Sequence, residues 1–94
     1  MTVSMIARFK VNDFAKWKKA YDQAAQYRKE GSAVAENIHR DLDDPNTVTL
    51  YNQYPDASTA KAVVARSETE EAQAMQKRAG VTLPVEVWLL ESFE

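Results

Sequence analysis

Apolar and polar residues alternate along four segments of the chain, and each alternation predicts a β-strand. The clearest segment runs from Val3 to Val11, where every second side chain is apolar and residues such as Arg8 and Lys10 lie between. The same two-residue period predicts further strands over residues 33–42, 47–54 and 85–93. The apolar side of the resulting sheet would carry Val3, Met5, Phe9, Val34, Ile38, Leu42, Val48, Leu50, Val87 and Leu89.

Between the first two strands, apolar residues recur every three or four positions, which predicts an amphipathic helix. Asn12 or Asp13 can cap its start, and Gly31 supplies a stop after about Glu30. Its apolar stripe would comprise Phe14, Trp17, Tyr21, Ala24 and Arg28.

A second helical region follows the third strand and is predicted in two pieces. Pro55 and Asp56 open the first piece. Residues 67–70, SETE, match a capping box, which predicts that a new helical segment starts at Ser67 and ends before Gly80. Pro84 is then expected to lie in a short loop ahead of the last strand.

The second and third strands are predicted to form a hairpin. Residues 43–46, DDPN, are a turn signal, because proline fixes φ and Asp and Asn side chains bond to local backbone amides. Only a loop with an odd number of residues keeps both apolar sets on one side of the sheet. That register places His39 beside Thr49 and Asn37 beside Tyr51.

The order β-α-β-β-α-β predicts an α+β fold, a ferredoxin-like sandwich with a four-stranded antiparallel sheet and helices on one face. A chain of 94 residues has room for one such domain, residues 1–94. The other face would present a mixed set: Arg8, Lys10, Ala35, Asn37, His39, Thr47, Thr49, Tyr51, Gln53, Trp88 and Leu90. Because large apolar side chains stand among these polar ones, we expect a second copy to cover the face, in a homodimer that encloses a lined cavity.

Charge and composition exclude several function classes. Twelve basic residues against fourteen acidic ones give a net charge of −2, without the basic stripe that nucleic acids require. The absence of cysteine excludes disulfides, thiolate metal sites and a cysteine nucleophile. Both glycines fall at predicted helix ends, so no phosphate-binding glycine loop is present. No apolar run approaches the roughly 20 residues that span a membrane, and no signal peptide is recognisable, so we expect a cytoplasmic protein.

Three segments together resemble a known group of proteins: residues 13–23, DFAKWKKAYDQ; residues 39–51, HRDLDDPNTVTLY; and residues 74–91, AMQKRAGVTLPVEVWLLE. With the order of elements, they resemble the dimeric α+β-barrel superfamily, which includes the antibiotic-biosynthesis-monooxygenase-like proteins. The resemblance implies a homodimer with a pocket either inside the barrel or between each sheet and its helices. It also implies an enzyme such as a cofactor-independent monooxygenase or isomerase acting on a small aromatic or conjugated molecule, without assigning any catalytic residue.

The candidate catalytic residues are His39, Tyr51, Asn37 and Arg8. His39 is the only histidine, and histidine is the residue type that exchanges protons near neutral pH. It would abstract a proton from an activated carbon, while the other three hold the developing anion. Alternatively, His39 only makes hydrogen bonds within a dimer interface or at the sheet edge, and the protein is a non-catalytic ligand-binding or structural dimer.

The candidate ligand-binding residues are Trp88, Thr49, Trp17 and Tyr21. Trp88 would form an apolar wall on the open face, or simply pack in an interface. Trp17 and Tyr21 could line a pocket between helix and sheet, or belong to the core. No metal site is expected, because the acidic residues beside His39 match no standard ligand spacing and are better explained by the turn.

Overall fold

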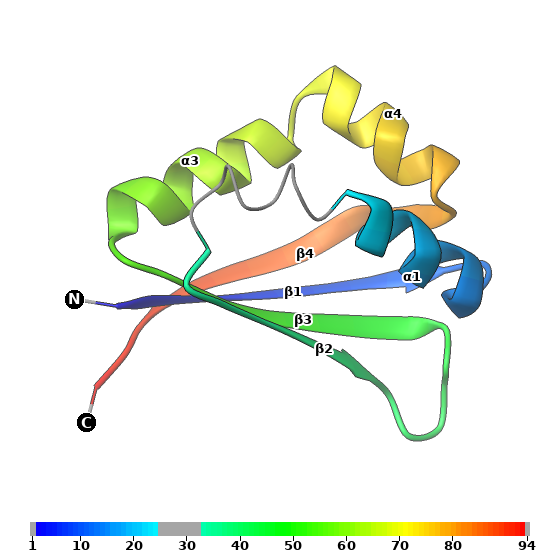
Figure 1. Ribbon diagram of the computed structural model, residues 1–94, viewed down its shortest axis with the longest axis horizontal. Helices are drawn as coiled ribbons and strands as arrows, with labels where there is room; N and C mark the ends of the chain where they lie inside the picture. The colour runs from blue at the N-terminus through cyan, green and yellow to red at the C-terminus, as the bar shows by residue number, and fades with distance from the viewer. Residues whose placement is uncertain (1, 25–32, 94) are drawn as a thin grey trace.

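The computed structural model describes residues 2–24 and 33–93, and these form a four-stranded antiparallel sheet with three helices on one face (Figure 1). The elements are β1 (Val3–Val11), α1 (Phe14–Gln23), β2 (Ala35–Arg40), β3 (Thr47–Tyr54), α3 (Ala57–Ser67), α4 (Glu70–Arg78) and β4 (Val81–Glu91). The strand order is β2-β3-β1-β4. The ferredoxin-like α+β prediction is therefore confirmed, including the second helix in two pieces. No described helix covers the other side of the sheet, which we call the open face.

The two central strands match their predicted ranges, and the register of the hairpin is confirmed. His39 lies opposite Thr49, and Asn37 lies opposite Tyr51. The strand predicted over residues 33–42 is shorter than expected, because Val34 and Leu42 lie in bends outside β2. Val34 is 64% exposed and Leu42 is fully exposed, so their predicted place on the buried side is wrong.

β4 begins four residues earlier than predicted, at Val81, and Pro84 lies inside it. A proline within a strand is tolerated here because β4 is an edge strand with an irregular pairing. Arg8 pairs with Glu86 but Lys10 already pairs with Thr82, so the pairing with β1 shifts at this point. The missing N–H of the proline therefore removes no regular ladder bond.

Side chains cap the helices where the sequence has Asp or Thr. Asp13 Oδ1 accepts a hydrogen bond from the backbone N–H of Lys16 at 3.2 Å, and so caps α1. Asp56 caps α3 through the N–H of Thr59 at 2.7 Å. α1 ends at Gln23, with Ala24 as its C-cap, so the first helix ends earlier than the predicted Glu30. The remaining predicted positions, including the stop at Gly31, fall outside the described residues.

The predicted capping box over residues 67–70 is wrong. Ser67 is the last residue of α3, and its hydroxyl donates to the Val64 carbonyl at 2.6 Å. Thr69 caps α4 instead, accepting from the N–H of Ala72 at 3.2 Å. A serine that bonds back to its own helix is unavailable to cap the next one, and this shifts the boundary by two residues.

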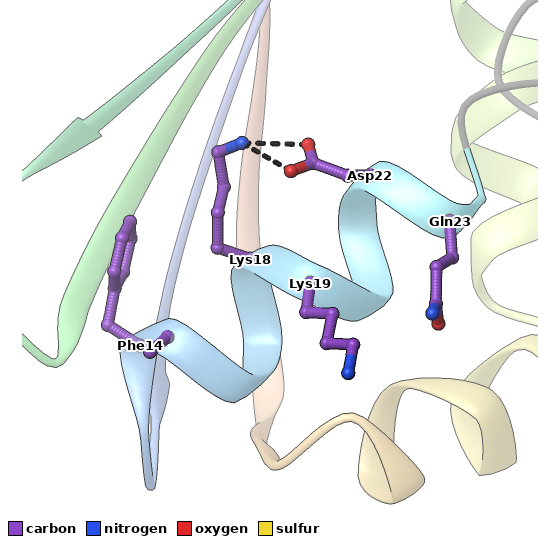
Figure 2. Close-up of a pocket in the computed structure, with 6 residues that line it drawn as sticks. Phe14, Lys18, Lys19, Asp22 and Gln23 are labelled. Carbon is purple, nitrogen blue, oxygen red and sulfur yellow. Dashed lines mark hydrogen bonds and ion pairs between the residues drawn. The ribbon is translucent and has the colours of Figure 1, made fainter.

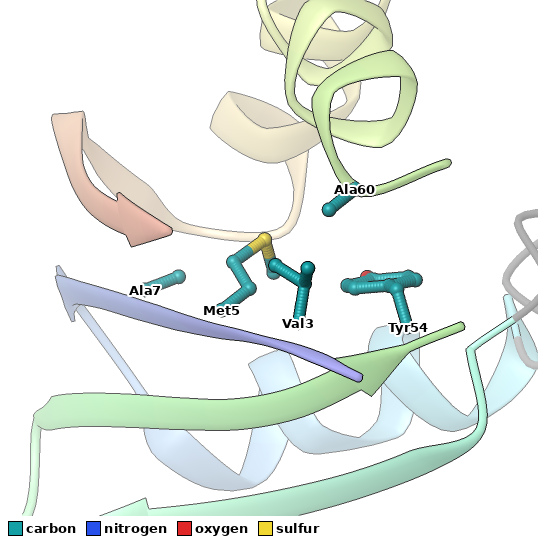
Figure 3. Packing of buried hydrophobic residues seen from close by; sticks show 5 residues of the cluster. All are labelled: Val3, Met5, Ala7, Tyr54 and Ala60. Carbon is teal, nitrogen blue, oxygen red and sulfur yellow. The ribbon is translucent and has the colours of Figure 1, made fainter. Parts of the chain in front are cut away.

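The core between sheet and helices consists of two clusters. In the first, side chains of β1 and Tyr54 meet Ala60 of α3: the cluster comprises Val3, Met5, Ala7, Tyr54 and Ala60 (Figure 3). The second is built around Trp17 of α1 and comprises Phe9, Val11, Trp17, Val48 and Val81. The ring centroids of Trp17 and Phe9 are 5.4 Å apart, which holds α1 against the sheet. Each of these two helices thus has a side chain in the core.

The β2–β3 turn confirms the structural explanation of its acidic residues at Asp44. The two carboxylate oxygens of Asp44 accept bonds from the N–H of Asn46 at 3.0 Å and the hydroxyl of Thr47 at 2.7 Å. The hydrogen bond from Thr47, and to a lesser extent that from Asn46, favours the ionised carboxylate. Together they lower the pKa of Asp44 below its ordinary value of 3.8.

Replacing Asp44 with alanine is expected to destabilise the hairpin at neutral pH but not in strong acid. The pKa of Asp44 is lower in the folded than in the unfolded state, so ionised Asp44 stabilises the folded state. This contribution is fully present above the unfolded pKa of 3.8, and it is lost as the pH falls through the lower pKa of the folded state. Urea unfolding of both proteins at about pH 7 and about pH 2.5 measures this. Asp43→Ala, at the exposed neighbouring position, is the control. An equal destabilisation by Asp44→Ala at both pH values would contradict the expectation.

Candidate functional site

A cleft lies between the sheet and its three helices and has two connected chambers. The larger chamber has a volume of about 720 Å³, and the smaller about 290 Å³. They form one cleft because they share six lining residues: Met5, Tyr21, Leu50, Val63, Ser67 and Gln76. The walls are mostly apolar, and volumes in this range accommodate small organic molecules.

Asn52 of β3 is the distinctive polar group of the smaller chamber. Its side chain points to the helix side, and the residue is only 4% exposed. Its Oδ1 atom is buried and has no hydrogen-bond partner in the described part of the chain. A buried acceptor without a partner costs about 1–3 kcal/mol, so such an atom in a cavity wall indicates a place for a ligand's donor group.

A carboxylate lies next to Asn52 in the same chamber. Glu36 of β2 is the register partner of Asn52, and both residues line the smaller chamber. The hydroxyl of Tyr21, on α1, donates to Glu36 Oε2 at 3.5 Å. The chamber therefore combines an amide, a carboxylate and a phenol on apolar walls.

Asn52 and Glu36 were not among the residues predicted to be functional, although the alternation contains a signal for both. In β3 the inward positions run Val48, Leu50, Asn52 and Tyr54, so one polar residue interrupts an apolar series. In β2 Glu36 occupies the inward position before Ile38. A polar residue at an inward strand position needs either a partner or a ligand.

The open face brings together the four residues predicted to be catalytic. The guanidinium of Arg8 donates to the hydroxyl of Thr49 at 3.2 Å and to the carboxylate of Asp41 at 2.8 Å. Asn37 donates to the backbone carbonyl of Tyr51 at 3.3 Å, and His39 is exposed opposite Thr49. Arg8 is thus held by a carboxylate of its own chain.

Tyr51 belongs to a small hydroxyl network on the open face. Its phenol oxygen lies 3.1 Å from Ser4 Oγ, which lies 3.1 Å from Ser92 Oγ, and Gln53 Nε2 donates to it at 3.5 Å. The hydrogen bonds with Ser4 and then Gln53 lower the pKa of Tyr51 from its ordinary value.

The residues predicted to bind a ligand lie on two different faces. Trp88 and Thr49 are on the open face, where Trp88 is 45% exposed and Leu90 is similarly exposed. Trp17 and Tyr21 line the larger chamber on the helix side, although Trp17 also belongs to the core. One site therefore cannot contain all the predicted residues within a single chain.

The exposed surface of α1 carries no candidate chemistry. A recess of about 630 Å³ has walls from α1 alone: Phe14, Ala15, Lys18, Lys19, Asp22 and Gln23 (Figure 2). Lys18 Nζ donates to both carboxylate oxygens of Asp22 at 2.7 Å, an exposed pair of the kind that only stabilises a helix. Among residues 2–24 and 33–93, no group of three His, Asp or Glu side chains could hold a metal ion. Nor is any helix in these ranges long and apolar enough to cross a membrane.

Comparisons with known proteins give matches in structure but not in sequence. No protein-family model and no curated sequence matches the chain. Among solved structures, SnoaB from Streptomyces nogalater, a cofactor-independent oxygenase, is 16% identical with a TM-score of 0.74, over 99% of this chain and 94% of SnoaB. A putative antibiotic biosynthesis monooxygenase from Bordetella bronchiseptica is 16% identical with a TM-score of 0.76, over 99% of this chain and 98% of that one. Another from Nitrosomonas europaea is 19% identical with a TM-score of 0.70, over 97% and 89%.

Each match covers nearly all of this chain and most or nearly all of the solved structure, while the sequence identities lie below 20%. At such identities the likeness concerns the path of the backbone. The resemblance inferred from the sequence is therefore confirmed at the level of structure: the chain has the fold of the antibiotic-biosynthesis-monooxygenase-like proteins.

Proposed function

We propose that the protein binds a small aromatic or conjugated molecule in the cleft and oxidises it with dioxygen, without a cofactor. The observation that carries the proposal is the buried Asn52 oxygen, which has no partner in the described part of the chain and lies in the wall of an apolar cavity. The shared fold with SnoaB, named a cofactor-independent oxygenase, supports this reaction class.

The residues of the smaller chamber suit proton abstraction. The carboxylate of Glu36 would take a proton from an activated C–H group of the ligand. The side-chain oxygen of Asn52 would orient the ligand by accepting a hydrogen bond from the ligand's hydroxyl group. The carbanion then transfers an electron to dioxygen, and recombination followed by loss of water converts CH₂ to C=O. One dioxygen is consumed and one water is released per molecule, so the reaction balances without an external reductant.

Two probes test the binding half of the proposal. 1-Naphthol and 1-methylnaphthalene have nearly the same shape, but only the former has a donor for Asn52. We expect 1-naphthol to bind at least about tenfold more tightly, measured through the fluorescence of Trp17 in the larger chamber. Equal affinities would remove Asn52 from ligand recognition.

1,8-Dihydroxyanthrone, which has an acidic CH₂ group and hydroxyl donors, tests the reaction half. We expect oxygen uptake with this substrate to fall by at least about 100-fold in Glu36→Gln, while 1-naphthol binding is preserved. If the reaction takes place in the cleft, His39→Ala should leave the rate of oxygen uptake unchanged, because His39 lies on the other side of the sheet. Unchanged turnover by Glu36→Gln would refute the assigned role of the carboxylate.

A second candidate places the reaction on the open face, enclosed by a partner copy. Its support is the set of Arg8, Thr49 and Asp41, together with the lowered pKa of Tyr51. Here His39 is the base, and Arg8, Asn37 and Tyr51 hold the anion. This alternative predicts the reverse result, in which His39→Ala abolishes turnover and Glu36→Gln leaves it intact. If the wild-type protein binds 1-naphthol but turns over no substrate, the remaining candidate is a non-catalytic ligand-binding or structural dimer.

Both versions include a homodimer, which we propose forms through the open face. Trp88 and Leu90 remain almost half exposed there, beside the half-buried Ile6. A contiguous apolar patch rimmed by polar groups is typical of an interaction surface.

A further inference from the structure

α4 differs from the other two described helices in having no residue in the core. α1 contributes Trp17 and α3 contributes Ala60, whereas none of the nine residues of α4 is buried. Both core clusters are complete without α4. No buried side chain therefore fixes this helix on the sheet, although it contacts β4.

The inner side of α4 faces the cleft instead. Ala72, Met75 and Gln76 line the smaller chamber, and Gln73 and Gln76 line the larger one. Met75 is 41% exposed although it lies on this inner side. A helix over a cavity gains its missing apolar contacts when the cavity is filled.

The last turn of α4 is joined to the segment after β1, whereas the bonds at its start connect only neighbouring residues of the α3–α4 segment. At its start, the Thr69 hydroxyl donates to the Arg66 carbonyl at 2.9 Å and accepts from the N–H of Ala72. At its end, the buried Gly80 has φ of +91° and its carbonyl accepts from the N–H of Asn12 at 2.9 Å. A Cβ atom at Gly80 would overlap the side-chain oxygen of Asn12, so this end fits closely.

The helix itself has the features of a unit that keeps its shape. Glu70 and Glu71 occupy its first turn, and Lys77 and Arg78 its last, in the arrangement that the helix dipole favours. Movement at Glu68–Thr69, between α3 and α4, would therefore swing the helix as a rigid unit about its end at Gly80.

We propose that α4 is a lid, which closes toward the sheet when a ligand fills the cleft and thereby buries Met75. The inference rests on the proposed ligand-binding function of the cleft. It assigns to α4 the role of completing the apolar wall around the bound molecule, which explains why its inner side is only partly covered in the free protein.

Pairs of spin labels on engineered cysteines test this, because the chain has no cysteine of its own. One label at Asp43→Cys, in the β2–β3 turn and away from both the cleft and the open face, serves both pairs. The second is at Ala74→Cys on the outer side of α4 or, as a matched control, at Ala65→Cys on α3; all three positions are exposed. Labelled protein is diluted with unlabelled protein, so that signals between copies are negligible.

We expect the α4 pair to have the broader distance distribution in the free protein. With saturating 1-naphthol, its mean distance should change by about 2–4 Å and the distribution narrow, while the α3 pair changes by less than about 1 Å. Ala72→Leu fills the smaller chamber from the lid and should narrow the distribution without any ligand. If the α4 pair is as narrow as the α3 pair in the free protein, or if bound 1-naphthol leaves it unchanged, the lid is refuted. If 1-naphthol does not bind, the proposed function fails separately, and the free protein and Ala72→Leu still decide about the lid.

Discussion

Asn52→Leu is expected to make the protein more stable and to abolish its recognition of a hydroxyl group. Leucine has nearly the shape of asparagine, and it removes a buried oxygen that has no partner in the described residues. The free energy of unfolding should rise by about 1–2 kcal/mol, since the desolvation cost of that oxygen disappears. The affinity for 1-naphthol should fall to that for 1-methylnaphthalene. Urea unfolding and fluorescence titration on the same preparations measure the two effects.

The opposite signs of these two effects separate a binding role from a structural one. If the fold required this asparagine, replacing it would lower the free energy of unfolding, because its hydrogen-bond partners would be left unpaired. Gln53→Leu is the control, since residue 53 is the next position of β3 and its side chain lies on the open face. It should leave discrimination between the two probes unchanged. A destabilised Asn52→Leu protein that still discriminates between them would contradict our assignment.

Trp88→Lys is expected to dissociate the proposed homodimer. A tryptophan at an interface often contributes 2 kcal/mol or more, so we expect the dimer dissociation constant to rise at least about 30-fold. Sedimentation of the wild-type chain at micromolar concentration should give twice the mass of a single chain, and the variant should sediment as a monomer. A wild-type protein that is monomeric under these conditions would refute the open face as a dimer interface.

Met75→Lys serves as the matched control for this experiment. Met75 is almost as exposed as Trp88, but it lies on α4, on the other side of the sheet. The same charge introduced there should leave the dimer intact. Dissociation by both variants would mean that added charge, rather than the open face, determines the change in mass.

The alternation of side chains was sufficient to predict the sheet, and it failed where a strand was not central. β1 and β3 have a strand on each side, so their apolar and polar positions are sharply separated and their ends agree with the prediction. β2 and β4 are edge strands, where fewer contacts fix the ends. Pro84 suggested a loop, because a sequence cannot show that the pairing with β1 shifts at that residue.

The candidate site was predictable only in part. The cross-strand neighbours of His39 followed from the register, which the apolar pattern determines. Asn52 looked like an ordinary member of a strand, since its proposed role depends on a side-chain oxygen without a partner among the described residues and on the cavity around it. Both depend on how α3 and α4 sit over the sheet, and no local pattern specifies that distance.

The irregular pairing around Pro84 also bears on how the protein resists aggregation. An edge strand with a continuous row of unpaired amides can pair with a strand of another molecule, and repeated pairing of this kind builds a fibril. In β4 this row is interrupted by a residue without an N–H and by the shifted pairing opposite Arg8 and Lys10. The β2 edge has six residues. Growth of the sheet sideways is thus discouraged at β4, and would not compete there with the proposed association through the face that carries Trp88.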